Sequence, residues 1–343
     1  MWRSPVAQRS GGPEVASSNL VIPTIIRTQR KMKVQSLHFL YKKVMSLRGK
    51  YTDSSVLLKS IQWLVCMALF TMVAFALWMM MPDKTSVESL KWFQFLQTTA
   101  TFLLPPFLMA YLWSTQPMRW LYLDQFISMK TAIIAVFLIL VASPGINLLS
   151  YLNQQITLPA CFSGIEAWMQ QQEDAAAVLT ERFLITDSIG IFIVNLLLMA
   201  LLPAVAEELT FRGVLQHLFT PRTCTRTPHI AIWATAIIFS AIHCQFYGFV
   251  PRMLLGAVFG YALVWSGSLW LPILMHFTNN ALAVIVYFTA HKAGWDTSTM
   301  DTFGTGDTWW VGVLSLVLVG VGIYLLRRSI TMSNASSRMS AGN

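Results

Sequence analysis

Ionisable and hydrogen-bonding side chains gather in three short clusters within apolar stretches of this 343-residue chain. They lie in the segments AEELTFRG, FSAIH and HFTNN, and they are Glu207, Glu208 and Arg212, then Phe239 and His243, then His276 and Asn280. An ionisable group inside a bilayer is costly unless it pairs or faces a cavity, so such residues indicate function by default.

Spacing gives the two acids of the first cluster different surroundings. Glu208 and Arg212 are four residues apart with the acid N-terminal, which is the favourable order for an ion pair on one helix face. Glu207 is rotated by about 100° from Glu208 around a helix, so its side chain is free to face another partner. The spacing therefore predicts a supporting ion pair beside a carboxylate that is available for chemistry.

The other two clusters each have the spacing of one helical turn. Phe239 can pack over the imidazole of His243, and His276 and Asn280 present two hydrogen-bonding groups side by side. Any one cluster could be a structural tie between helices. Counting about 1.5 Å per residue, however, places all three near the middle of a bilayer core about 30 Å thick. We therefore expect one carboxylate, two imidazoles and an amide to meet.

Long apolar runs must position these clusters. The chain is 55% hydrophobic and 11% charged, whereas a soluble domain is about 25% charged, and a span needs roughly 20 apolar residues. The sequence predicts an all-α, polytopic transmembrane helix bundle of about eight spans, with seven or nine as alternatives. The expected spans are 61–81, 93–113, 131–149, 189–206, 230–245, 250–265, 269–288 and 309–326.

Basic residues predict the orientation of the bundle. Eleven Lys or Arg precede Ser60, against two acids, which is typical of a cytoplasmic N-terminus. The loop charges agree with both termini in the cytoplasm, and Arg252 is the single exception. We assign the basic segment to orientation and to attraction by anionic lipid, because no nucleic-acid motif accompanies it.

On these residues the sequence resembles the family of intramembrane proteases that includes the CAAX prenyl endopeptidase and the bacteriocin-processing and immunity proteins (CPBP, or Abi). The family pattern is EExxxR, FxxxH, and HxxxN or HxxxD on three separate helices. Every position is present here in the same order, between residues 198 and 282. The resemblance implies an eight-helix intramembrane endopeptidase that needs no cofactor.

The resemblance also implies a role for each residue. Glu207 and His243 would hold and deprotonate a water molecule, and His276 with Asn280 would stabilise the tetrahedral oxyanion. The supporting residues would be Glu208, Arg212 and Phe239.

Three other functions stay open on the sequence alone. Glu207, His243 and His276 could form a zinc site of two histidines and one glutamate with an open water position, although the chain has no HExxH motif. A transporter could use the same groups as a proton relay, but paired repeats are not visible. A membrane scaffold or immunity protein could keep the fold without turnover.

We expect three parts along the chain: a basic, disordered cytoplasmic segment at 1–55, a transmembrane helical domain at 56–328 with protease motifs at 198–282, and a cytoplasmic tail at 329–343. Met32 is an alternative to Met1 as the first residue. The expected partners are the lipid bilayer and a peptide or protein substrate, either prenylated or leader-bearing, and no nucleic acid. The expected location is the bacterial cytoplasmic membrane.

Overall fold

A computed structural model describes residues 44–220, 228–295 and 302–341, and in these ranges every regular element is a helix. The predicted N-terminal segment lies mostly outside the described residues, as do both candidate start residues. In the first half of the chain the helices are α2 (Val56–Met79), α3 (Val87–Thr98), η1 (Thr99–Leu103), α4 (Leu104–Trp113), α5 (Pro117–Trp120), α6 (Met129–Gln154), η2 (Ala160–Phe162) and α7 (Ser163–Leu184).

The second half contains the segments that carry the three polar clusters. Its helices are α8 (Ile189–Asn195), η3 (Leu196–Leu201), α9 (Leu202–Glu208), η4 (Leu209–Gln216), α10 (His217–Phe219), α11 (Pro228–Ala241), α12 (Phe249–Ser266), α13 (Trp270–Ala293), η5 (Gly306–Thr308) and α15 (Trp309–Ala341). The last helix continues without a break through the predicted tail boundary.

The predicted membrane bundle is confirmed as all-helical, and among the described residues seven helices are long and apolar enough to span a bilayer. The predicted run 230–245 is the apolar but shorter α11, which has 14 residues. A helix of that length is only about 21 Å long, which is shorter than the bilayer core. By helix length the structure therefore favours seven spans over eight or nine. Which ends face the cytoplasm stays a prediction.

Local sequence signals set the ends of several helices. A serine hydroxyl accepts the backbone N–H three residues on at the start of four helices, and these N-caps are Ser55, Ser86, Ser128 and Ser188. Gly267 and Gly294 end α12 and α13 with φ of 67°, a left-handed conformation that glycine adopts without steric cost.

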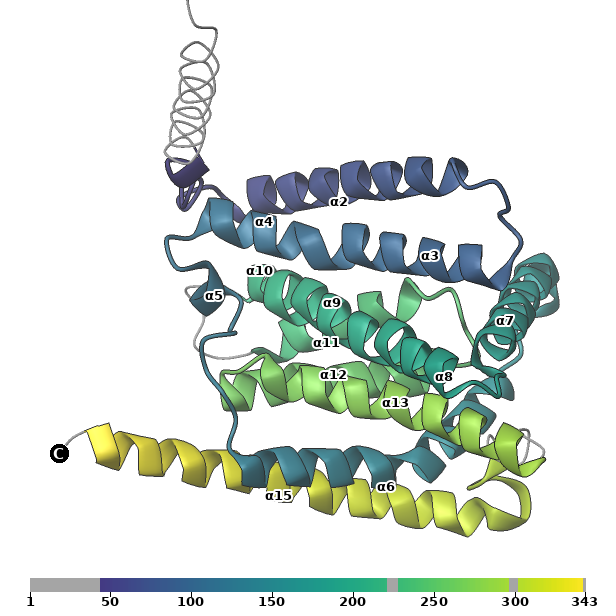
Figure 1. The fold of residues 1–343 in the computed structure, drawn as a ribbon. Helices are drawn as coiled ribbons and strands as arrows, with labels where there is room; N and C mark the ends of the chain where they lie inside the picture. Colours follow the sequence, from purple (N-terminus) through teal and green to yellow (C-terminus); the bar gives the residue numbers. More distant parts are fainter. Residues whose placement is uncertain (1–43, 221–227, 296–301, 342–343) are drawn as a thin grey trace, which may run out of the picture.

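The bundle is arranged in layers of roughly aligned helices (Figure 1). At one side lie α2 and α3–α4, and at the other α6 packs against α15. Between them lie α8–α10, α11, α12 and α13. The most apolar windows of α12 and α13 are 39% buried, against 17% for α2 and α15. The outer helices therefore turn apolar side chains outward, as a lipid-facing surface requires, and the central helices hold the polar clusters.

An amphipathic helix outside the predicted spans lies across one end of the bundle. This is α7, whose Trp168 ring lies 5.7 Å from that of Phe246, just beyond α11. Burial raises the pKa of the Glu173 carboxyl, while a backbone hydrogen bond from Tyr247 and the charge of Arg252 act in the opposite direction. The acids in this stretch thus belong to a helix packed against the segment that follows His243.

Candidate active site

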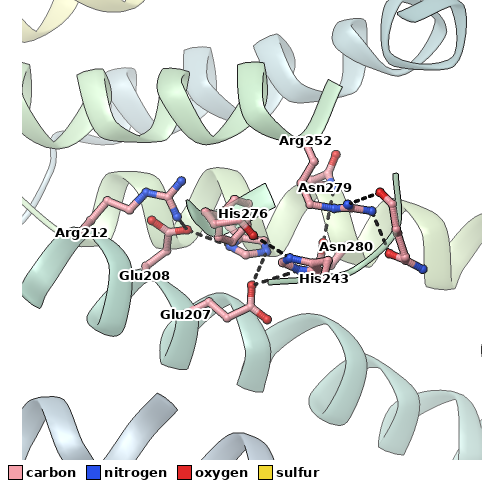
Figure 2. Close-up of polar contacts among 10 residues, drawn as sticks. Glu207, Glu208, Arg212, His243, Arg252, His276, Asn279 and Asn280 are labelled. Atoms are coloured by element: carbon pink, nitrogen blue, oxygen red, sulfur yellow. Dashed lines mark hydrogen bonds and ion pairs between the residues drawn. The ribbon is translucent and has the colours of Figure 1, made fainter. Parts of the chain in front are cut away.

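Three central helices bring the predicted residues together (Figure 2). Glu207 lies in the last turn of α9. Its Oε2 atom is 4.0 Å from His243 Nε2 and 3.8 Å from His276 Nε2. His243 lies two residues beyond the end of α11, and His276 lies within α13. The spacing argument correctly placed one carboxylate and two imidazoles at a common point.

Glu208 and Arg212 form the ion pair that their spacing predicts. Arg212 Nη1 lies 2.6 Å from Glu208 Oε1, and both side chains are 0% exposed. The other guanidinium nitrogen, Nη2, donates to the carbonyl of Gly256 at 2.9 Å. Glu207 is 17% and His243 27% exposed, so the ion pair is sealed from solvent whereas Glu207 and His243 are accessible to it.

A contact between Glu208 and His276 was missed by the sequence reading. His276 Nδ1 lies 2.8 Å from Glu208 Oε1, and an ionised carboxylate only accepts hydrogen bonds. Nδ1 therefore carries a proton, and Nε2 points toward Glu207. Sequence spacing relates residues on one helix, so it could not reveal this bond between α9 and α13.

His243 is fixed in the same way by a backbone group. Its Nδ1 atom lies 2.7 Å from the carbonyl oxygen of Phe239, and a carbonyl can only accept. Nδ1 donates, which leaves Nε2 of the neutral ring as an acceptor directed at Glu207. The one-turn spacing of FxxxH thus serves a backbone hydrogen bond as well as ring packing.

Aromatic rings enclose the two imidazoles. Phe239 meets His243 and His276 edge-on, with centroids 5.1 and 5.9 Å apart. The Arg212 guanidinium lies 4.6 Å from the centre of the same Phe239 ring. Phe259 stacks on His276 at 5.4 Å. These rings exclude water from one side of the histidines, which strengthens the electrostatic interactions in the site.

Asn280 follows His276 by one turn on α13, as predicted, and is half-buried. Its Oδ1 atom accepts a hydrogen bond from Nδ2 of Asn279 at 3.2 Å. This bond uses the oxygen of the Asn280 amide, and the NH₂ group is a separate donor. Asn279 is a further residue that sequence reasoning missed, although the doubled asparagine was a visible signal.

Wide helical turns flank the two glutamates. The π-helical segments η3 and η4 lie directly before and after α9. Such turns occur often at functional sites, because the inserted residue changes the direction of the side chains around it. The local geometry of α9 therefore agrees with a site built on Glu207 and Glu208.

A comparison with known protein families matches the segment that carries the three polar clusters. Residues 189–282 match the family model described as type II CAAX prenyl endopeptidase Rce1-like. Over these residues the chain is similar to that family. The match confirms the resemblance predicted from the motifs, and the Rce1-like segment contains every predicted site residue. Together with the seven apolar helices, it identifies a multi-pass integral membrane protein.

Two curated relatives are similar to the Rce1-like part of the chain. The uncharacterized protein YpbD of Bacillus subtilis (strain 168) is 31% identical over 92 residues, which cover 26% of this chain and 43% of that protein. An uncharacterized 24.3 kDa protein of Escherichia coli is 31% identical over 101 residues, 29% of this chain and 46% of that protein. The chain thus spans less than half the length of these relatives, and no solved structure matches it.

Proposed function

We propose that this protein is an intramembrane endopeptidase in which Glu207 activates a water molecule. The observation that carries the proposal is the convergence of three acceptor atoms, Glu207 Oε2 and the Nε2 atoms of His243 and His276. Each imidazole is held in that tautomer by a partner at Nδ1. The family match of residues 189–282 supports the same class of reaction.

The separations suit a bound water. A water about 2.8 Å from each of two partners, at nearly a right angle, leaves the partners about 4 Å apart. The measured separations are 3.8 and 4.0 Å. Glu207 would take one proton from this water, and the resulting hydroxide would attack the scissile carbonyl. Glu207 would then return the proton to the amine that leaves.

The developing oxyanion needs donors. The NH₂ group of Asn280 would be one donor, on an amide whose oxygen is held by Asn279. His276 becomes a second donor when its Nε2 takes up a proton from solvent, while its Nδ1 proton stays bonded to the Glu208 carboxylate. Glu208 in turn is held by Arg212. Donors preset in a water-poor cavity stabilise the transition state more than donors in bulk water.

Zinc is the second candidate, because two imidazole nitrogens and a carboxylate oxygen are a known catalytic ligand set. Tetrahedral ligands about 2.05 Å from zinc lie about 3.3 Å apart, so Glu207 would have to approach each imidazole by roughly half an ångström. In the described residues no three His, Cys, Asp or Glu side chains are arranged to hold a metal ion. Activity that falls on chelation and returns with zinc would establish this alternative.

The direct test is a substrate trap. Full-length protein with Glu207→Gln is expressed beside wild type, and peptides that copurify are identified by mass spectrometry. We expect the variant to retain peptides that wild-type protein cleaves, and the cleavage to stop with His243→Ala. Failure of wild-type protein to cleave any retained peptide would point to a scaffold or transporter instead.

A further inference from the structure

Arg252, in the first turn of α12, forms no close ion pair in the described parts of the chain, although Glu173 and Glu207 lie near enough to act on its charge. Its Nη1 and Nη2 atoms donate to the backbone oxygen and the side-chain Oε1 of Gln245, at 3.2 and 2.8 Å. Among the described side chains no carboxylate oxygen lies within 4.0 Å of the guanidinium nitrogens. Arg212, by contrast, has Glu208 at 2.6 Å.

An arginine in an apolar helix is expensive when its charge is not balanced. Arg252 is half-buried, its hydrogen-bond partner Gln245 is neutral, and Glu173 and Glu207 act on its charge only from beyond ion-pair distance. A guanidinium has five N–H groups in a planar fork that matches the two oxygens of a carboxylate. Gln245 takes two of these donors, so the side chain keeps both charge and hydrogen-bonding capacity for a ligand.

The side chain lies beside the candidate active site. Figure 2 shows Arg252 at the opposite end of the polar cluster from Arg212, with His243 and Asn280 between them. Its partner Gln245 is two residues from His243 in the chain. A substrate held at Glu207 would therefore lie within reach of this cation.

The segment that carries Arg252 is fixed to the bundle rather than free. Asn153 of α6 donates to the carbonyl of Phe246 at 2.7 Å and accepts from the backbone N–H of Val250 at 3.2 Å. The Ser240 hydroxyl donates to the carbonyl of Phe249 at 2.7 Å. Since Ser240 and Asn153 are both buried, the position of Arg252 relative to His243 is preset, as a specificity group requires.

We propose that Arg252 binds a carboxylate of the substrate and gives the site a preference for peptides that carry one near the scissile bond. The inference rests on the proposed peptidase function. The carboxylate is either the C-terminal group of the peptide or an acidic side chain, because both present the same two oxygens. Neighbouring apolar surface makes the pairing stronger than it would be in water.

The probe is a set of synthetic peptides in matched pairs. Each pair shares one apolar sequence and differs either by a free C-terminal carboxylate against a carboxamide, or by an internal Glu against Gln. Full-length protein in lipid nanodiscs is measured for cleavage, and protein with Glu207→Gln is measured for binding of the same peptides. The two kinds of pair distinguish the two sources of carboxylate.

We expect wild-type kcat/KM to fall about 10- to 100-fold from carboxylate to amide in one kind of pair, the usual effect of a charge-assisted hydrogen bond. Arg252→Gln should remove the difference, and Arg252→Lys should restore part of it. The matched control is Arg119→Gln, because Arg119 is exposed and outside the site. It should keep the full preference.

The binding measurement separates this proposal from the peptidase function. Carboxylate-dependent binding that Arg252→Gln abolishes would support the proposal even if cleavage were absent, in which case the peptidase function would fail alone. Equal handling of carboxylate and amide by wild-type protein would overturn the role of Arg252. A preference that persists in Arg252→Gln would overturn it as well.

Discussion

Replacing Arg212 with methionine would leave the Glu208 carboxylate in the interior of the bundle without its guanidinium partner. The two groups lie 2.6 Å apart and are 0% exposed, so water cannot compensate for the loss. Removal of one member of a buried pair costs about 3–5 kcal/mol. At about 1.4 kcal/mol per factor of ten, the folding equilibrium constant should fall by roughly two to three and a half powers of ten.

A double variant separates lost charge pairing from lost packing. Glu208→Gln combined with Arg212→Met removes both charges, and the amide oxygen can still accept from His276 Nδ1. Because this variant buries no ion, it avoids the large desolvation penalty of a charge, and it should recover to within about 1–2 kcal/mol of wild type. Its activity should stay low, because the His276 ring then lacks the negative charge that faces its Nδ1 atom.

The assay is unfolding in mixed detergent micelles with increasing SDS, followed by tryptophan fluorescence. Cleavage by the same preparations is measured in parallel. If Arg212→Met were as stable as wild type, or if the double variant were no more stable than the single one, the interpretation of this pair as a buried charge balance would be refuted.

Three further predictions concern packing, donors and metal. In Gly256→Ala the added Cβ would lie 3.1 Å from the Phe239 ring, so thermal unfolding should show a loss of about 1–3 kcal/mol; Gly164→Ala, with nothing within 4 Å, should not be destabilised. Asn280→Ala should lower kcat by about 10²- to 10³-fold, as for other oxyanion donors. Asn279→Ala should lower it by less, and both variants should keep the wild-type unfolding midpoint. Exhaustive chelation should leave kcat unchanged, and zinc-restored activity would contradict the metal-free mechanism.

Much of this architecture could be predicted because it depends on patterns local to the chain. Apolar runs of bilayer length predicted the spans, and one-turn spacing predicted the pair Glu208–Arg212. The contact of Glu208 with His276 required the packing of α9 against α13, which no periodicity contains. The predicted depth in the membrane gave the common level of the three clusters. It could not give the tautomers of His243 and His276, which depend on their hydrogen-bond partners.

There are also physical reasons why the sequence did not predict α7, the π-helical turns and the place of Arg252. The acid-rich stretch of α7 has the composition of a loop, and its helix is evident only where its apolar face meets the bundle. The π-helical turns around α9 have no distinct sequence signature in this chain. Arg252 did leave a signal, since it was the one charge that disagreed with the predicted orientation, and the structure places it beside the site.

The central claim is that the Glu207 carboxylate activates water for peptide hydrolysis. Its most direct test is kcat of purified full-length protein in nanodiscs on a peptide recovered from the trap, for wild type and Glu207→Gln. The account predicts that kcat falls by about three powers of ten or more, as when a catalytic base or nucleophile is removed, at an unchanged unfolding midpoint. Cleavage at the wild-type rate by folded Glu207→Gln protein would contradict it.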